Sequence, residues 1–394
     1  MKLQVSFLSK PNMLNNSKKI IISCSSTGSL VNFRGKLIEE LVKNNQVYVF
    51  TPKIRDKKLL NQLNDLGVTI CENNLMRNNV SVLGDIQYMM QLHKIIKRVK
   101  PDIFFSYTFK PIIFGSMVAS YCGVKGIVAM LTGLGYNFTE SAKNSTVGKI
   151  THKLLRFSLN SSDRVKVVFQ NADDYRELIE SKIIDNQSKT FIVNGSGVDL
   201  TRYEYSVPDT SRINFLMMAR LIKAKGVREY YEAAKTIREK YPQVTFTLIG
   251  FWETHGIDSI DEELYEKIKS NEVIEFHGWV DDVRPFIKAS SVVVLPSFYR
   301  EGIPRSVQEG MAMGRAIITT DMVGCKETVN PDPEYPNGFL IPTQNVEALV
   351  EKMEYFINNP DEIVRFGKNG RKFTEEKFDV NKVNKHMLEI LEIN

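Results

Sequence analysis

The 394-residue chain has few cysteines and few histidines, which excludes several kinds of site. Its four cysteines, Cys24, Cys71, Cys122 and Cys325, are scattered with no paired spacing. This scatter argues against a disulfide framework or a zinc site, and it fits a reducing compartment. The five histidines also lack the spacing of metal ligands. We therefore expect no metal site.

The chain also lacks long apolar runs and the glycine-rich loops of common nucleotide sites. No stretch approaches the roughly 18 to 20 apolar residues that a membrane span needs, and the apolar run at the N-terminus is too short for a signal peptide. No Gly-x-x-x-x-Gly-Lys-Ser/Thr sequence occurs, and the segment Ser25–Gly28 holds a single glycine. A Walker loop is therefore absent, and dinucleotide oxidoreductase chemistry is weakly supported.

Negative charge is scarce in the first part of the chain. Residues 1–150 contain 20 Lys and Arg against 8 Asp and Glu, whereas residues 206–394 contain 24 against 30. A basic surface attracts nucleic acid, anionic lipid headgroups or phosphorylated substrates. The alternative, a solvated surface with no partner, stays open on this evidence.

Apolar strands alternate with amphipathic helices along the chain, which predicts parallel sheets covered by helices on both faces. A polar, proline-containing break at Val207–Ser211 divides the series into two similar halves. We predict an α/β protein with a first domain over 1–207, in which 1–17 is an extension, and a second domain over 208–376. A terminal helix within 377–394 is expected to pack back on the first domain.

The elements follow from the spacing of the apolar residues. The predicted strands span 19–24, 46–50, 68–71, 102–106, 126–131, 165–169, 190–193, 213–218, 244–249, 273–276, 291–295, 316–319 and 338–341. The predicted helices span about 32–44, 55–66, 81–99, 226–240, 261–270, 281–289, 304–313, 344–358, 361–376 and 380–393. Ligands of doubly wound domains bind at the carboxyl ends of the strands, so the cleft between the domains is the expected binding site.

Two carboxylates mark one strand–loop–helix unit of the second domain. The apolar run Ser291–Leu295 predicts a buried strand, and Pro304 suits the first turn of the following helix. Glu301 then lies in the loop at the helix entrance, and Glu309 lies inside the helix. The free backbone N–H groups and the positive dipole end at this entrance favour an anion.

Two cations follow the first strand of the same domain. Arg220 and Lys225 lie in the segment Ala219–Gly226, at the carboxyl end of that strand and before a helix. Each side chain can bond phosphate oxygens. Taken singly, either residue would be read as surface charge; the shared position with the Glu301 loop favours a site.

Together these stretches resemble the family 4 glycosyltransferases, retaining enzymes of the GT-B fold that use nucleotide sugars. The motifs that carry the resemblance are Ala219–Gly226, Gly278–Val283, Leu295–Ser297, Glu301–Pro304, Glu309–Gly314 and Thr320–Glu327. A bacterial branch that builds capsule, O-antigen or other repeat units on polyprenyl diphosphate is similar at Tyr107–Pro111, Leu131–Gly135, Phe169–Asp174 and Gly195–Asp199. The resemblance runs from about residue 18 over nearly the whole chain, and it implies two Rossmann-like domains.

The resemblance implies a role for each matching polar residue. Arg220 and Lys225 would bind the donor diphosphate, where charge grows as the glycosyl bond breaks. Glu309 would accept hydrogen bonds from the ribose hydroxyls. Glu301 would contact the donor sugar and stabilise an oxocarbenium-like centre, so that Glu301, Arg220 and Lys225 are the expected catalytic residues. A capping or surface role for Glu309 is the alternative.

The resemblance also assigns main-chain contacts. The N–H groups after Gly302, including that of Ile303, would help to hold the sugar or the diphosphate. The main chain at Trp279 and Val280 would meet the nucleobase, although core packing of Trp279 is an equal alternative. In the first domain, Gly28 would permit a close approach of the backbone to the diphosphate.

Expected acceptor-side residues are Asn32, Arg34, Lys110, Gly133 and Gly135. Many family members carry a histidine at the segment that here reads Tyr-Thr-Phe-Lys and ends at Lys110, so Lys110 is a hypothetical substitute. For the two later glycines, a simple turn of the chain is the alternative. There is no Asp-x-Asp in the chain, so diphosphate binding through a metal is not expected.

The resemblance implies a retaining, metal-independent transfer of a sugar, with UDP as the expected nucleotide, to a glycan or polyprenyl-diphosphate-linked acceptor, with no cofactor and no nucleic-acid partner. We expect a cytoplasmic protein, with contact at the inner face of the membrane as a further hypothesis. The basic amphipathic segment 145–157 suits such a contact, or else packs on its own sheet. Two other functions stay open, a GT-B nucleotide-sugar epimerase and a non-catalytic nucleotide-sugar-binding subunit.

Overall fold

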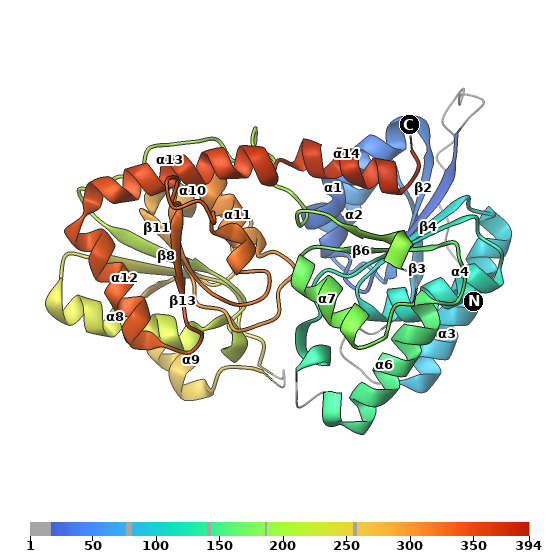
Figure 1. The fold of residues 1–394 in the computed structure, drawn as a ribbon, viewed down its shortest axis with the longest axis horizontal. Helices are drawn as coiled ribbons and strands as arrows, with labels where there is room; N and C mark the ends of the chain where they lie inside the picture. Colours follow the sequence, from blue (N-terminus) through green and yellow to red (C-terminus); the bar gives the residue numbers. More distant parts are fainter. Residues whose placement is uncertain (1–16, 76–80, 140–142, 186, 255–257, 394) are drawn as a thin grey trace. The chain divides into compact units, whose positions relative to one another are not determined.

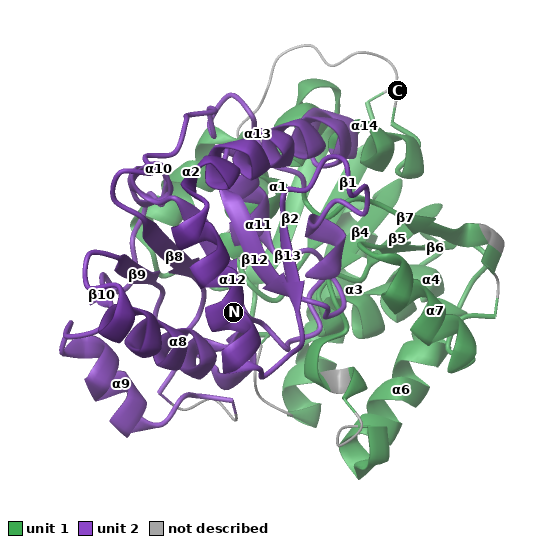
Figure 2. Ribbon diagram, turned by 60° about the vertical axis from the view of Figure 1, so that its left-hand side comes forward, with its two compact units in different colours: residues 1–196, 384–394 green, residues 197–383 purple. Residues whose placement is uncertain are grey.

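The computed structural model describes residues 17–75, 81–139, 143–185, 187–254 and 258–393. The chain forms two compact units, unit 1 from residues 1–196 with 384–394 and unit 2 from residues 197–383 (Figures 1 and 2). Each unit is built on one parallel sheet. The predicted class, two doubly wound α/β domains, is therefore confirmed, whereas the extension over 1–17 lies outside the described residues except for Ser17.

Within the described residues, the sheet of unit 1 has seven strands in the order β3-β2-β1-β4-β5-β6-β7, all parallel. The strands are β1 (Lys19–Ser23), β2 (Gln46–Pro52), β3 (Thr69–Asn73), β4 (Ile103–Tyr107), β5 (Gly126–Met130), β6 (Val165–Phe169) and β7 (Thr190–Ile192). The helices are α1 (Gly28–Asn44), α2 (Lys57–Asp65), α3 (Val82–Val99), α4 (Ser116–Tyr121), α6 (Thr146–Leu159) and α7 (Ala172–Glu180), with short η1 (Pro111–Gly115), η2 (Gly135–Phe138) and η3 (Gln187–Lys189) turns.

Alternate strand residues of unit 1 enter two separate cores, one on each face of its sheet. Ile21 packs in a core with side chains of α3, α4, α6 and α7. Its neighbours Ile20 and Ile22 pack in the other core with side chains of α1, α2 and α14 (Val380–Ile390). From α14, Met387 and Ile390 are fully or nearly buried there. The C-terminal residues therefore complete the core of the N-terminal unit.

Within the described residues, the sheet of unit 2 has six strands in the order β10-β9-β8-β11-β12-β13, all parallel. The strands are β8 (Asn214–Met218), β9 (Thr245–Ile249), β10 (Glu275–Phe276), β11 (Val292–Leu295), β12 (Ala316–Thr320) and β13 (Gly338–Ile341). The helices are α8 (Val227–Lys240), α9 (Glu262–Lys269), α10 (Arg284–Ala289), α11 (Arg305–Ala312), α12 (Val346–Asn358) and α13 (Pro360–Lys377), with η4 (Lys223–Lys225) and η5 (Lys326–Thr328) turns.

The structure divides the chain after residue 196, not at the polar break near 207. Residues 197–207 belong to unit 2 because their backbone is bonded into it. Val198 N–H donates to Phe378 O at 2.8 Å, and Val380 N–H donates to Val198 O at 3.0 Å. Further along, Ser206 N–H donates to Met313 O at 3.2 Å. The polar break at Val207–Ser211 therefore does not coincide with the division between the two units.

Arg315 holds the same segment from inside unit 2. The side chain is fully buried, and burial lowers its pKa to about 10. Its guanidinium donates hydrogen bonds of 2.6–3.0 Å to the carbonyl and hydroxyl oxygens of Ser206 and to the carbonyl oxygens of Ile287, Lys288 and Met313. One side chain thus joins residue 206, the end of α10 and the turn after α11.

Most predicted elements are present, with differences at helix starts. The first helix begins at Gly28 and not near 32, because Ser29 N–H and Leu30 N–H already donate to Ser26 O and Thr27 O. The helices α4 and α7 were not predicted individually. Each is short, six and nine residues. In the part of the chain that the structure describes, every helix is too short or too polar to cross a bilayer.

Candidate functional site

Loops at the carboxyl ends of neighbouring strands carry the predicted residues of unit 2. Arg220 and Lys225 follow β8, Trp279 follows β10, and Glu301 follows β11. Since β8 pairs with both β9 and β11, the loops after these strands meet at one edge of the sheet. This is the edge at which doubly wound sheets bind ligands.

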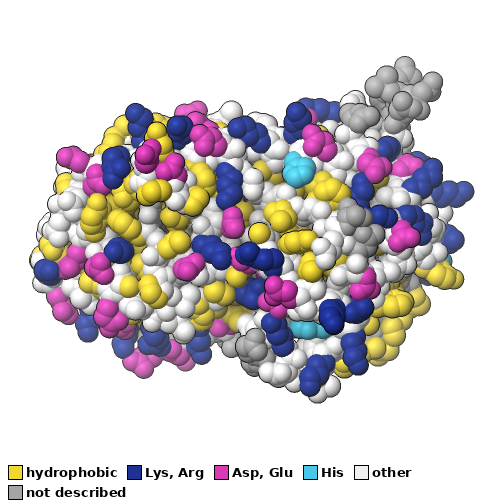
Figure 3. All heavy atoms as spheres, viewed as in Figure 1, with side chains coloured by type: hydrophobic (Ala, Val, Ile, Leu, Met, Phe, Trp, Pro, Cys, Tyr) yellow, Lys and Arg dark blue, Asp and Glu magenta, His cyan; other side chains and the backbone are white. Residues whose placement is uncertain are grey.

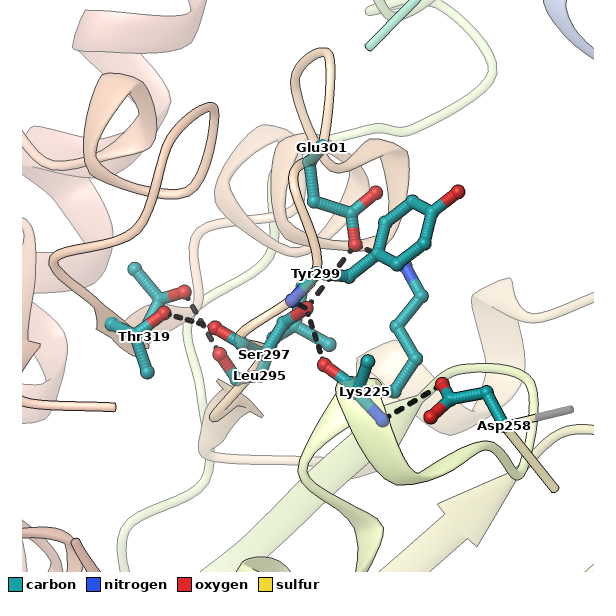
Figure 4. A network of polar contacts seen from close by, with 9 residues as sticks. Lys225, Asp258, Leu295, Ser297, Tyr299, Glu301 and Thr319 are labelled. Carbon is teal, nitrogen blue, oxygen red and sulfur yellow. Dashed lines mark hydrogen bonds and ion pairs between the residues drawn. The ribbon is translucent and has the colours of Figure 1, made fainter. Parts of the chain in front are cut away.

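Lys225 and Glu301 form an ion pair between Nζ and Oε1 (Figure 4). Their side chains are only 14% and 13% exposed. The Nζ atom also lies 5.5 Å from the centre of the Tyr299 ring, and Ser297 Oγ lies 3.3 Å from Glu301 Oε1. The pair therefore sits in a partly dry environment, where its charges interact more strongly than they would in bulk water.

The two loops that carry this pair are interlocked through their backbones. Phe298 N–H and Tyr299 N–H both donate to Ala224 O, at 2.8 and 3.0 Å. Gly226 has φ +76°, and a Cβ there would collide with the carbonyl group of Pro296. Gly324 has φ +80°, and a Cβ there would collide with the backbone of the Glu301 loop. Glycine at both positions lets the backbones approach closely and positions the ion pair.

Arg220 is paired in the structure with a carboxylate that no motif contains. Its Nη1 lies 3.0 Å from Glu253 Oε2, and the two side chains are 31% and 27% exposed. Nearby, Ala224 N–H donates to Asp258 Oδ2 at 3.0 Å. Burial raises the pKa of Asp258, and the hydrogen bond from Ala224 opposes this rise. The segment after β9 therefore supplies acids to the loop that carries the cations.

Glu309 lies on α11 and is held by two neighbours. Tyr203 Oη donates to Glu309 Oε1 at 2.8 Å, and Arg305 Nε donates to the same oxygen at 3.0 Å. Burial, followed by the charge of Glu309, raises the pKa of Tyr203, so its hydroxyl remains a donor at neutral pH. The other oxygen, Oε2, has no hydrogen-bond partner among the described residues. The carboxylate of Glu309 is therefore oriented by hydrogen bonds to one of its two oxygens.

The N-terminus of α11 has no capping side chain. Pro304 is the N-cap residue and lies outside the helix, a correction to the prediction that it opens the first turn. The first turn contains no acidic residue. Before it, Gly302 is buried and the side chain of Ile303 packs into the core of unit 2. The first N–H groups of α11 therefore remain suited to an external anion.

Trp279 lies at the surface and not in the core, with 64% of its side chain exposed. It forms an edge-to-face pair with Phe251, 39% exposed, with ring centroids 5.9 Å apart. Gly250 N–H donates to Gly278 O at 2.9 Å, which joins the two loops that carry these rings. Val280 is partly buried against the core. An exposed aromatic pair therefore stands at the ends of β9 and β10.

Three predicted residues of unit 1 lie on α1. Gly28 is its first residue, and a Cβ there would meet no atom within 4 Å, so no packing in the protein requires glycine. Asn32 is exposed. Arg34 is only 3% exposed, and its guanidinium lies 5.5 Å from the centre of the Tyr107 ring. Arg34 is therefore buried against Tyr107 in this structure, and its acceptor-side role stays a prediction.

The remaining predicted residues of unit 1 follow β4 and β5. Lys110 Nζ forms an ion pair with Asp85 at 2.7 Å, so this cation is engaged by α3. Gly133 and Gly135 both have positive φ, at +110° and +52°, which explains glycine there by backbone conformation alone. Across the described part of the chain, no group of three or more His, Cys, Asp or Glu side chains could hold a metal ion.

Four residues of the site lie outside the sequence motifs. Tyr203 and Glu253 are far from Glu309 and Arg220 in sequence, and Phe251 is separated from Trp279 by a helix and a strand. Only Arg305 carried a usable signal, because its spacing of four residues before Glu309 favours a contact on one helix face.

Comparison with known families covers both halves of the chain. The family described as glycosyl transferases group 1 matches residues 204–373, and the family described as glycosyl transferase 4-like matches residues 22–171. Among solved structures, the Anabaena protein Alr3699/HepE in complex with UDP superposes with a TM-score of 0.75 at 18% identity, over 95% of this chain and 99% of that one. This likeness identifies the fold.

Two curated relatives are similar over most of their length. One is the N,N'-diacetylbacillosaminyl-diphospho-undecaprenol alpha-1,3-N-acetylgalactosaminyltransferase of Campylobacter jejuni, 23% identical over 86% of this chain and 90% of the relative. The other is the UDP-Gal:alpha-D-GlcNAc-diphosphoundecaprenol alpha-1,3-galactosyltransferase of Escherichia coli, 26% identical over 70% and 71%. Both names describe sugar transfer to a sugar on diphosphoundecaprenol.

Proposed function

Because the chain belongs to the group 1 glycosyl transferases and is a glycosyltransferase of the GT-B fold, we propose that it transfers a sugar from a UDP-linked donor to a sugar on polyprenyl diphosphate. The names of the two relatives support this acceptor class. The proposed setting is surface-polysaccharide biosynthesis, in contact with the membrane that holds such acceptors.

The ion pair at the entrance of α11 carries the proposal. Lys225 Nζ pairs with Glu301, which lies in the loop that leads to the uncapped N-terminus of α11, and both Lys225 and Arg220 follow strand β8. A diphosphate at this position would meet two cations and the first N–H groups of α11. It would displace Glu301 from Lys225, which frees that carboxylate for the hydroxyls of the donor sugar.

The same arrangement supports retention of configuration and independence from metal ions. Once the diphosphate has displaced Glu301 from Lys225, this carboxylate would be occupied by the hydroxyls of the donor sugar, so we assign it no role as a general base. The leaving diphosphate can itself accept the proton of the acceptor hydroxyl. The charge that builds on it is stabilised by Lys225, Arg220 and the α11 N–H groups. No cofactor enters this mechanism.

A panel of UDP-sugars tests the proposal. We expect acceptor-dependent release of UDP with at least one donor when a diphosphoundecaprenol-linked sugar is supplied, and an unchanged rate after treatment with a chelator. The anomeric coupling constant of the product reports retention. Interconversion of UDP-sugars without any acceptor would favour an epimerase. Binding of UDP-sugar without any turnover would favour a non-catalytic subunit.

Tyr203→Phe tests the predicted role of Glu309 in binding the ribose. Loss of the 2.8 Å hydrogen bond leaves Glu309 less firmly oriented, so we expect a rise of several-fold in the KM for the donor with little change in kcat. Tyr205→Phe is the nearby control, because Tyr205 lies two residues after Tyr203 and is 39% exposed. A fall in kcat with an unchanged KM would contradict this role.

A further inference from the structure

Unit 1 exposes a set of large apolar side chains on the helices of one sheet face. Their exposed fractions run from 46% to 83%. We call this set the apolar face; its members are Val82, Leu83, Ile86 and Met90 of α3, Tyr121 at the end of α4, and Val147, Ile150 and Phe157 of α6. In Figure 3, hydrophobic side chains gather at the lower right, over the region of α3 and α6 in Figure 1.

The three helices share one groove, which joins Met90, Tyr121 and Phe157 of the apolar face into one surface. A groove of about 640 Å³ is lined by Met89 and Met90 of α3, Met117 and Tyr121 of α4, and Phe157 of α6. Methionine side chains are flexible and polarisable, and they adapt to irregular apolar partners.

Packing on the sheet does not account for these side chains. α6 buries Leu155 and Leu159, and α3 buries Leu92 and Ile95, on the sides that face the core. The exposed apolar residues lie on other sides of the same helices. Contiguous apolar surface of this kind marks an interaction site in a folded protein.

Basic residues border the apolar face. We call Lys94 and Lys97 of α3 with Lys149, Lys153 and Arg156 of α6 the basic rim. All of them are exposed. Arg156 pairs with Asp185 at 2.9 Å, whereas the four lysines have no carboxylate partner among the described residues. The nearby acid on α3, Asp85, is engaged by Lys110. The border of the face therefore carries a net positive charge.

We infer that the apolar face and its basic rim dock unit 1 on a bilayer that contains anionic phospholipids. The apolar side chains would enter the boundary between headgroups and acyl chains, and the lysines would contact lipid phosphates. The charge selects this occupant over a second copy of the chain, because a symmetric dimer through this face would bring two basic rims together.

The inference deepens the proposed function by naming the surface that meets the membrane, and it rests on the proposed lipid-linked acceptor for its purpose. Binding to lipid needs neither donor nor acceptor. It can therefore be measured separately from transfer, and failure of one is distinguishable from failure of the other.

Sedimentation of the full chain with vesicles tests the inference. We expect binding to phosphatidylcholine vesicles that contain phosphatidylglycerol, and much weaker binding to phosphatidylcholine alone. Lys149→Glu with Lys153→Glu is expected to weaken binding by about tenfold or more, since each basic residue near an anionic surface contributes about 1 kcal/mol. Met90→Ser with Phe157→Ser is expected to weaken it by a similar factor.

Matched controls come from unit 2. Lys235→Glu with Lys288→Glu changes the net charge equally, and Val207→Ser with Leu340→Ser removes comparably exposed apolar side chains. Both controls should bind as the wild type does. Transfer to a water-soluble acceptor should survive in every variant. Unchanged vesicle binding in both variants of the face, or a wild-type dimer that these variants dissociate, would overturn the inference.

Discussion

Replacing Lys225 by alanine is expected to lower kcat for sugar transfer by about 10² to 10³-fold, the usual cost of removing one donor that stabilises developing charge. The substitution removes the cation expected to hold the diphosphate, and it leaves Glu301, only 13% exposed, without Lys225 as its ion-pair partner. Steady-state release of UDP in the presence of acceptor measures the effect. Circular dichroism establishes that the variant is folded.

Lys223→Ala is the matched control for this prediction. Lys223 lies two residues earlier in the same η4 turn, and its side chain is exposed. We expect nearly wild-type turnover from it. Glu301→Gln, which keeps the shape of the side chain and removes its charge, should also lose most of the turnover. Activity near that of the wild type in both Lys225→Ala and Glu301→Gln would refute the site.

Arg315→Ala is expected to destabilise the protein by about 3 kcal/mol or more, since each buried polar group left without a partner costs about 1–3 kcal/mol. The guanidinium bonds oxygen atoms of Ser206, Ile287, Lys288 and Met313, and its removal leaves each of these oxygens without that donor. Thermal unfolding of purified variants measures the loss.

Arg284→Ala is the control, which shows how much stability is lost when an exposed arginine is removed. Arg284 is 41% exposed and pairs with Asp282 of its own turn at 2.7 Å. Such exposed pairs contribute little to stability, so the melting temperature of this variant should scarcely change. Equal melting temperatures for Arg315→Ala and the wild type would show that the buried bonds do not hold residues 197–207.

Much of the fold was accessible from sequence because the strands are short and buried on both faces. Runs such as Val292–Leu295 and Ile20–Ile22 are apolar without alternation, as parallel strands between two helix layers must be. Glu301, Arg220 and Lys225 could be placed together by the same reasoning. Each follows a strand, and parallel strands bring their carboxyl ends to one edge.

Contacts between segments that are distant in sequence could not be predicted from the sequence. Nothing in the local pattern around Tyr203 or Glu253 indicates a partner, because each contact depends on how a loop returns to the sheet. The burial of Arg34 was likewise not predicted. Its position on α1 places it over Tyr107, where the aliphatic and planar parts of the side chain can be buried.

Unit 1 is built from two segments that are far apart in the chain, residues 1–196 and 384–394. The ribosome synthesises residues 384–394 after all of unit 2, so Met387 and Ile390 join the core of unit 1 last. Until then, the face of the first sheet that bears Ile20 and Ile22 stays partly uncovered. Expression of residues 1–196 alone is therefore expected to yield an aggregation-prone fragment.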